Sequence, residues 1–265
     1  MMASLINRKQ LKAETKVMLQ SAQVSPKAMT ALYLGITLVL NLLSSFSGDS
    51  GILSVFVSVL ISLMSMVLTG GFVLYCMAIR RGERAEFLTL FDGFSFAGKL
   101  IALHFVMSLF IMLWTMLFIL PGIVAAYRYR FAQYNLFENP GIGVMEALDM
   151  SKKQTLGYKS QLFMLDLSYF GWALLATIPS GFETFHATYE TFQAAGGFAG
   201  AELTYSSLLP VWGWILLSGV WSLFISLFFL PNYQCVELGY FEIAKSTSGI
   251  GSAPQQDSWS DPTPY

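Results

Sequence analysis

Long apolar stretches separated by short polar segments make up most of the chain. Most of them reach the roughly 20 residues that an α-helix needs to cross a hydrocarbon core of about 30 Å. They show no alternation of apolar and polar positions, so the pattern predicts spanning helices rather than the strands of a barrel. The expected fold class is all-α, a polytopic membrane helix bundle with six transmembrane helices and short interfacial helices. The expected spans are residues 28–47, 52–79, 99–120, 122–138, 160–179 and 208–230.

The junction between the third and fourth stretches decides between five spans and six. A single helix over residues 99–138 would be about 60 Å long, twice the thickness of the hydrocarbon core. Pro121 and Gly122 lie in the middle of this segment. Proline interrupts a helix and glycine tolerates tight turns, so a helical hairpin with two spans is expected here.

The distribution of positive charge favours six spans independently. With six spans and a cytoplasmic N-terminus, every group of Lys and Arg except Arg128 and Arg130 lies on the cytoplasmic side. With five spans, Lys152, Lys153 and Lys159 would lie outside, against the bias of positive charge toward the cytoplasm. The chain is therefore expected to be a multi-pass protein of the cell membrane with both termini in the cytoplasm. The cytoplasmic groups are Arg8, Lys9, Lys12, Lys16 and Lys27; Arg80, Arg81, Arg84 and Lys99; Lys152, Lys153 and Lys159; and Lys245.

The polar segments complete the expected domain organisation. Residues 1–27 form a basic amphipathic helix on the cytoplasmic side, residues 28–245 the six-helix membrane domain, and residues 246–265 a disordered cytoplasmic tail. A short interfacial helix is expected between the fourth and fifth spans, with Asn139 as its N-terminal cap and Gly157 as its C-terminal cap. The basic residues of both interfacial helices either bind anionic lipids of the inner leaflet or only fix the topology.

Composition agrees with a membrane location. The 265 residues are 55% hydrophobic and only 12% charged, whereas a soluble domain carries about 25% charged residues. The net charge of −1 creates no field that favours nucleic acid, so no nucleic-acid partner is expected. Cys76 and Cys235 lie in apolar stretches without the spacing of a metal or redox motif, which indicates buried free thiols.

Ionisable residues inside the apolar stretches are the first candidates for a functional site. Each costs at least about 2.5–3.5 kcal/mol at the centre of a membrane helix unless it is paired or reaches the interface. His104, Arg128, Arg130 and Asp166 are expected to form a polar cluster in the inner half of the membrane. Arg130 is the better geometric partner of Asp166, and Arg128 is the alternative. The cluster is either an anion or proton site or a pair that only specifies helix packing.

A second candidate lies in the segment expected outside the membrane. Glu183, His186 and Glu190 have the spacing of neighbours on one helix and form a candidate site for a divalent metal. Such spacings also arise by chance, and an aromatic helix resting on the membrane is the expected interpretation. No cofactor is expected. The sequence has no metalloprotease motif, catalytic triad pattern or phosphate-binding glycine loop, so no enzymatic activity is expected either.

Serines recur at every fourth position in two of the apolar stretches. Small residues on one helical face allow close backbone approach in lipid, where apolar burial gives helices little reason to associate. The two stripes are expected to pack against each other, with Ser54 opposite Ser218. The alternatives are hydrogen bonds to the serine's own helix and packing against the first span or a second copy. The stripes are Ser54, Ser58 and Ser62, and Ser218, Ser222 and Ser226.

Several short motifs occur together along the chain. They are Leu120-Pro121-Gly122, Tyr127-Arg128-Tyr129, Glu146-Ala147 followed by Ser151 and Gly157, Trp172, and Pro231-Asn232-Tyr233 with Phe241. In this combination the chain resembles the bacterial integral membrane proteins of domain-of-unknown-function family 975. The resemblance covers most of the chain and implies a polytopic bacterial membrane protein with no established activity.

Three classes of function follow from these patterns. The expected one is a non-catalytic integral membrane protein, a scaffold, accessory or protective protein that acts through protein or lipid contacts. The alternative is a small transporter or channel that uses the Arg/Asp/His polar cluster, and an intramembrane enzyme is the third class. The expected partners are the lipid bilayer, anionic lipids at the inner leaflet and another membrane protein.

Overall fold

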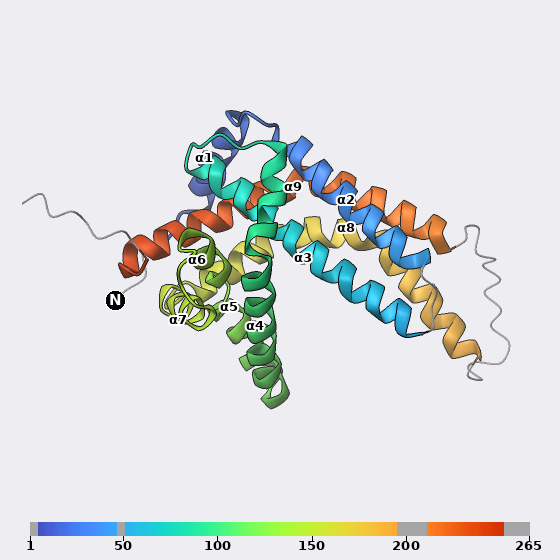
Figure 1. Cartoon of the computed structure of the whole chain (residues 1–265). Helices are drawn as coiled ribbons and strands as arrows, with labels where there is room; N and C mark the ends of the chain where they lie inside the picture. Colours follow the sequence, from blue (N-terminus) through green and yellow to red (C-terminus); the bar gives the residue numbers. More distant parts are fainter. Residues whose placement is uncertain (1–4, 47–50, 195–210, 252–265) are drawn as a thin grey trace, which may run out of the picture. The chain divides into compact units, whose positions relative to one another are not determined.

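The computed structural model describes residues 5–46, 51–194 and 211–251, and helices are the only regular elements in these ranges. The expected all-α fold class is confirmed (Figure 1). The helices are α1 Arg8–Gln20, α2 Pro26–Phe46, α3 Ile52–Arg80, the 3-10 helix η1 Phe87–Phe96, α4 Ala97–Leu117, α5 Ile119–Arg128, α6 Ala132–Glu138, α7 Val144–Gln154, α8 Lys159–Ala194 and α9 Val211–Ser248.

Five helical segments in the described ranges are long and apolar enough to cross a membrane. They overlap the first, second, third, fifth and sixth predicted spans. The chain is therefore a multi-pass membrane protein. The segments are Pro26–Ser44, Ile52–Arg80, Phe87–Leu117, Lys159–Gly181 and Leu216–Ser248.

The fourth predicted span, residues 122–138, is interrupted in the structure. α5 and α6 are separate helices with a turn at residues 129–131 between them. α5 has 10 residues, which corresponds to about 15 Å, or half of the hydrocarbon core. The expectation of one continuous helix is wrong here, and the count of six spans stays a prediction.

Two hydroxyl groups explain why α5 ends where it does. Ser151 Oγ and Thr155 Oγ1 donate hydrogen bonds to the carbonyl of Arg128 at 3.0 and 3.3 Å. They satisfy this carbonyl without a further turn of helix. The turn between α4 and α5 lies at Phe118, whose backbone is extended (φ −159°, ψ 149°). Pro121 therefore falls in the first turn of α5, where its missing N–H costs little.

The chain folds as two compact units. The bundle unit comprises, of the described residues, 8–46, 51–101, 164–194 and 211–237. The hairpin unit comprises, of the described residues, 5–7, 102–163 and 238–251. α8 and α9 each contribute residues to both units.

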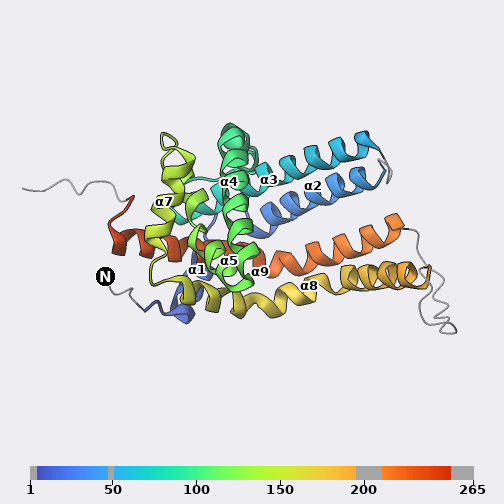
Figure 2. The ribbon, with the colours of Figure 1, turned by 90° about the horizontal axis from the view of Figure 1, so that it is seen from below.

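Glycines bring α3 and η1 into backbone contact within the bundle unit. A Cβ atom at Gly71 would lie 1.7 Å from the carbonyl oxygen of Leu90, and one at Gly93 would lie 2.3 Å from that of Val67. No larger residue fits at either position without a backbone shift. α2 runs beside α3 (Figures 1 and 2). The buried residues of α3 all lie in its second half, between Val67 and Ile79.

Large apolar side chains cover the outside of the spanning helices. On α3, Leu53 is 71% and Phe56 64% exposed, and on α8 both Leu167 and Phe170 are 54% exposed. In a bilayer these side chains contact lipid rather than water, so their exposure carries no penalty.

The hairpin unit has its own apolar core. α4 and α5 approach closely because Gly122 lies against Thr115, whose Oγ1 would be 2.1 Å from an added Cβ. Asn135 of α6 and Gln154 of α7 exchange two hydrogen bonds of 2.8 Å. The core residues are Leu103, Ala125, Tyr129, Ala132 and Leu148.

The short helix expected between the fourth and fifth spans is α7. Its N-terminal cap is Gly143 rather than Asn139. The carbonyl of Asn139 accepts a hydrogen bond from Ile142 N at 3.1 Å, so a turn precedes the helix. The C-terminal cap of α7 is Thr155 rather than Gly157, and Gly157 adopts φ 84°, a conformation that favours glycine, in the turn that follows.

Candidate functional site

A group of polar side chains joins α8 to α9 in the bundle unit. The hydroxyl of Tyr233 donates a hydrogen bond to Oδ1 of Asp166 at 2.8 Å. The hydroxyl of Tyr169 donates to Oδ1 of Asn232. The rings of Tyr169 and Tyr233 meet edge to face with centroids 5.2 Å apart. We call Asp166, Tyr169, Asn232 and Tyr233 the α8–α9 polar cluster.

The local sequence explains why the cluster forms at this level. Asp166 and Tyr169 are three residues apart and therefore share one face of α8. Asn232 and Tyr233 directly follow Pro231, which lies inside α9. Proline supplies no N–H to the helical ladder, so α9 is weakened at this point. The hydrogen bonds to α8 stabilise α9 where its own ladder is interrupted.

α1 lies against the same part of α8. Lys12 Nζ donates to Ser168 Oγ at 2.8 Å and lies 3.9 Å from the centroid of the Tyr169 ring. Arg8 donates to the carbonyl of Met164 at 2.7 Å. Burial lowers the pKa of Lys12, and the charge of Arg8 lowers this pKa further. A cation from α1 therefore lies beside the α8–α9 polar cluster.

The predicted Arg/Asp/His cluster is divided between the two units. Asp166 belongs to the bundle unit, and His104, Arg128 and Arg130 belong to the hairpin unit. Within the bundle unit, Tyr233 is a hydrogen-bond partner of Asp166. The pairing of Asp166 with Arg130 or Arg128 stays a prediction.

The two arginines have different surroundings in the hairpin unit. The guanidinium carbon of Arg130 lies 5.4 Å from the centroid of the Tyr127 ring. Arg128 lies near α7, where its charge acts on Asp149. The pKa of Asp149 is lowered first by a hydrogen bond from Lys153, and nearby positive charges, including that of Arg128, lower it further. Arg128 thus extends the charged surface of α7.

Two serines of the α3 stripe form hydrogen bonds with the backbone of their own chain segment, which was one of the alternatives expected from the sequence. Ser54 Oγ donates to the carbonyl of Gly51 at 2.9 Å, and Ser62 Oγ donates to that of Ser58 at 2.8 Å. Ser58 and Ser62 are exposed. This exposure speaks against packing of the two stripes within one chain, and packing against a second copy stays a prediction.

The serine stripe of α9 is better covered. Ser226 is buried, whereas Ser218 and Ser222 are half-buried. Beside them, a Cβ atom at Gly219 would lie 2.1 Å from Leu38 Cδ1 of α2. The small residues of α9 therefore allow close approach to α2.

The candidate metal site on α8 is not described at the level of side chains. The side chains of Glu183, His186 and Glu190 lie outside the described residues. Among the residues that are described, no three His, Cys, Asp or Glu side chains gather as a metal site would require. Metal binding at Glu183, His186 and Glu190 stays a prediction.

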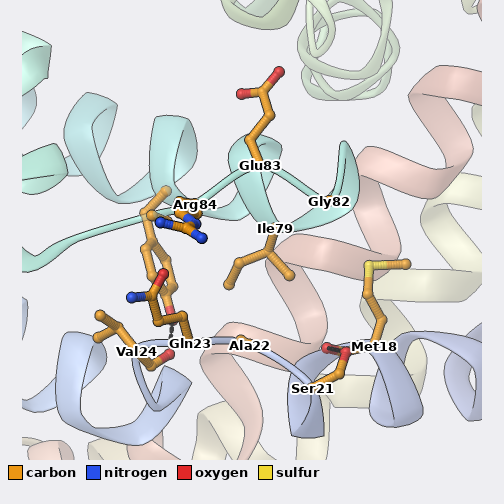
Figure 3. Close-up of a pocket in the computed structure, with 11 residues that line it drawn as sticks. Met18, Ser21, Ala22, Gln23, Val24, Ile79, Gly82, Glu83 and Arg84 are labelled. Atoms are coloured by element: carbon orange, nitrogen blue, oxygen red, sulfur yellow. Dashed lines mark hydrogen bonds between the residues drawn. The ribbon is translucent and has the colours of Figure 1, made fainter.

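A cavity of about 260 Å³ lies between the α1–α2 connection and the chain that follows α3 (Figure 3). Gln23 and Arg84 line it, and the hydroxyl of Tyr75 donates to the carbonyl of Val24 at 2.8 Å. The Glu83 carboxylate points away from the other labelled side chains (Figure 3). The cavity lies just below the usual size of small-molecule sites, and its arginine suits an anionic group.

Sequence reasoning identifies only one member of the α8–α9 polar cluster as a candidate site residue, Asp166, because a charge inside a span is costly. Asn232 and Tyr233 enter only through the motif that carries the family resemblance, and Tyr169 is missed, because neutral polar residues carry no such signal individually. Pro231 was the available clue, since proline in a spanning helix needs polar groups nearby to satisfy the freed backbone.

Comparison with known proteins places the cluster within a family. A family model described as "Protein of unknown function (DUF975)" matches residues 118–247, from the start of α5 to the end of α9. This segment contains the whole α8–α9 polar cluster. No curated protein and no solved structure gives a significant match. The resemblance expected from the short motifs is confirmed over residues 118–247, about half of the chain rather than most of it, and this part belongs to the DUF975 family of proteins of unknown function.

Proposed function

We propose that this membrane protein is a non-catalytic scaffold, accessory or protective protein that acts through lipid and protein contacts. In this proposal it lies in a bacterial cell membrane with both termini in the cytoplasm. One observation carries it: five of the seven exposed cations on the described helices lie on α1 and α7, outside the candidate spans, and the other two, Lys27 and Lys99, lie in the first turns of α2 and α4. The exposed cations of α1 and α7 are Arg8, Lys9, Lys16, Lys152 and Lys153.

Anionic lipid headgroups are the partners that fit this arrangement. A basic residue near an anionic membrane surface contributes about 1 kcal/mol of attraction. α1 carries cations on its exposed side, and Lys12 and Arg8 also contact α8. Binding of lipid by α1 would therefore stabilise the part of α8 that carries the polar cluster.

The test compares the protein in nanodiscs with and without phosphatidylglycerol. We expect the anionic lipid to raise the melting temperature of the wild type and to raise it less for the double variant Lys9→Gln/Lys16→Gln. Glu14→Gln, on the same helix, is the matched control and should respond more strongly than wild type. Equal responses of all three proteins would contradict the proposal.

A small transporter is the second candidate, and the α8–α9 polar cluster favours it. Lys12, Tyr169 and Asp166 place ionisable groups beside the proline of α9. Weakened helices with polar groups are typical of transporter sites. Proteoliposomes that carry a pH-sensitive dye would show a proton flux that Asp166→Asn abolishes. A wild-type flux equal to that of empty liposomes would remove proton transport as a candidate.

A further inference from the structure

The two cysteines of the chain meet in the interior of the bundle unit. Cys76 lies on α3 and Cys235 on α9, and they are the only cysteines in the sequence. Both side chains are 0% exposed, and a side-chain hydrogen bond joins them. Buried free thiols were expected from the sequence, but nothing in their spacing predicted that they would be neighbours.

A second contact fixes the same two helices independently. Arg80 lies four residues after Cys76 and therefore shares its face of α3. Its Nη1 donates a hydrogen bond to the backbone carbonyl of Cys235 at 3.0 Å. The same face of α3 thus holds Cys235 through both its backbone and its side chain.

We propose that Cys76 and Cys235 form a redox-active pair, which hydrogen peroxide converts to a disulfide that joins α3 to α9. One thiolate attacks the peroxide O–O bond and becomes a sulfenic acid, and hydroxide leaves and takes up the thiol proton as water. The second thiol then attacks the sulfenic sulfur and releases a second water. Two electrons pass from the thiols to the peroxide.

The surroundings explain why the pair responds to peroxide and not to larger oxidants. Hydrogen peroxide is small and uncharged, so it reaches an interior that excludes bulky reagents. In the reducing cytoplasm the pair remains reduced until peroxide is present.

The test counts free thiols in the full-length protein in its membrane. Membranes are treated with hydrogen peroxide, denatured, and labelled with a maleimide polymer that adds mass at each free thiol. We expect two labels before treatment, none after it, and two again after dithiothreitol, with a linked peptide that contains Cys76 and Cys235. Cys76→Ala and Cys235→Ala are the controls: each should show one label before peroxide and one after dithiothreitol, and neither can give the linked peptide.

Several outcomes would overturn the proposal. Two labels that persist in the wild type after peroxide would show that the thiols do not react. Loss of both labels without recovery in dithiothreitol would mean separate over-oxidation of each cysteine. A disulfide-linked dimer would assign the cysteines to contacts between chains. Because the wild type alone gives these results, the test does not depend on folding of the variants.

Discussion

The polar side chains between α8 and α9 satisfy one another inside a largely apolar bundle. The hydrogen bond from Tyr233 to Asp166 matters most, because Asp166 carries the costliest group within its span. The hydrocarbon core holds no water that could replace a lost hydrogen-bond donor. Loss of the tyrosine hydroxyl should therefore be measurable as lost stability.

Tyr233→Phe is expected to lower the free energy of unfolding by about 1–2 kcal/mol, because Asp166 loses a hydrogen-bond donor. Tyr33→Phe is the matched control. Tyr33 also shares a hydrogen bond, with Thr69, but the Thr69 hydroxyl keeps its hydrogen bond to the carbonyl of Ser65, so loss of the Tyr33 hydroxyl should cost less than about 0.5 kcal/mol. Unfolding in detergent measures both effects. Equal losses of unfolding free energy would show that the hydrogen bond between Tyr233 and Asp166 stabilises the protein no more than the one between Tyr33 and Thr69.

The ion pair of Asp149 and Lys153 on α7 predicts a dependence of stability on pH. The distance from Lys153 Nζ to Asp149 Oδ2 is 2.7 Å, and this hydrogen bond is the main cause that lowers the pKa of Asp149. Because the pKa of Asp149 in the folded state lies below the ordinary value of 3.8, the ion pair contributes its full stability at pH values above 3.8. This stability is lost as the pH falls through the folded-state pKa.

The difference in melting temperature between wild type and Asp149→Asn should therefore be present at neutral pH and disappear in acid. Lys153→Gln should reproduce the behaviour of Asp149→Asn because it removes the same hydrogen bond. A difference in melting temperature that stays constant as the pH falls would contradict this interpretation.

At the scale of elements, two contacts between helices depend on residues without side chains. Gly71 and Gly93 let α3 and η1 touch through their backbones, and Gly122 lets α5 lie against the Cα and the side chain of Thr115 on α4. A backbone atom cannot rotate away from an added Cβ as a flexible side chain can. These positions should therefore tolerate substitution least.

Gly71→Ala is expected to lower the free energy of unfolding by at least about 2 kcal/mol, because its Cβ would meet the carbonyl of Leu90. Gly35→Ala is the matched control within a spanning helix. No atom lies within 4 Å of an added Cβ at Gly35, so stability should stay constant or rise by up to about 1 kcal/mol. Similar effects of the two changes on unfolding in detergent would contradict the proposed packing of α3 and η1.

The sequence predicted elements well where a single stretch of chain decides them. Apolar length placed five spans, and Pro121 indicated the turn between α4 and α5 to within three residues. The break after α5 could not be predicted in this way. It depends on Ser151 and Thr155, which lie 23 and 27 residues beyond Arg128 along the chain. The α8–α9 polar cluster depends in the same way on distant partners.

For the whole molecule, the distribution of charge predicts which side of the membrane each surface faces. Ser151 is buried, so a cysteine there would not report on sidedness. Met145 of α7 is 60% exposed and is the better position. In a background with Cys76 and Cys235 replaced by alanine, a cysteine at position 145 should resist an impermeant maleimide in whole cells.

A cysteine at position 190 should react with the same reagent in intact cells, and both positions should react after the cells are opened. Labelling at position 145 in intact cells would support five spans instead of six. In that topology the exposed lysines of α7 would lie outside the cell rather than at the inner leaflet.

The hydrogen bond from Arg80 to Cys235 has a consequence for biosynthesis, because it joins residues 155 positions apart. The ribosome releases α3 and η1 well before α9, and their glycine contacts need only a short loop to close. The face of α3 that carries Cys76 and Arg80 gains its contacts with Cys235 only after α9 has been inserted. We expect chains truncated after residue 194 to be cleared by membrane proteases much faster than the full-length protein, and equal lifetimes would contradict this order of assembly.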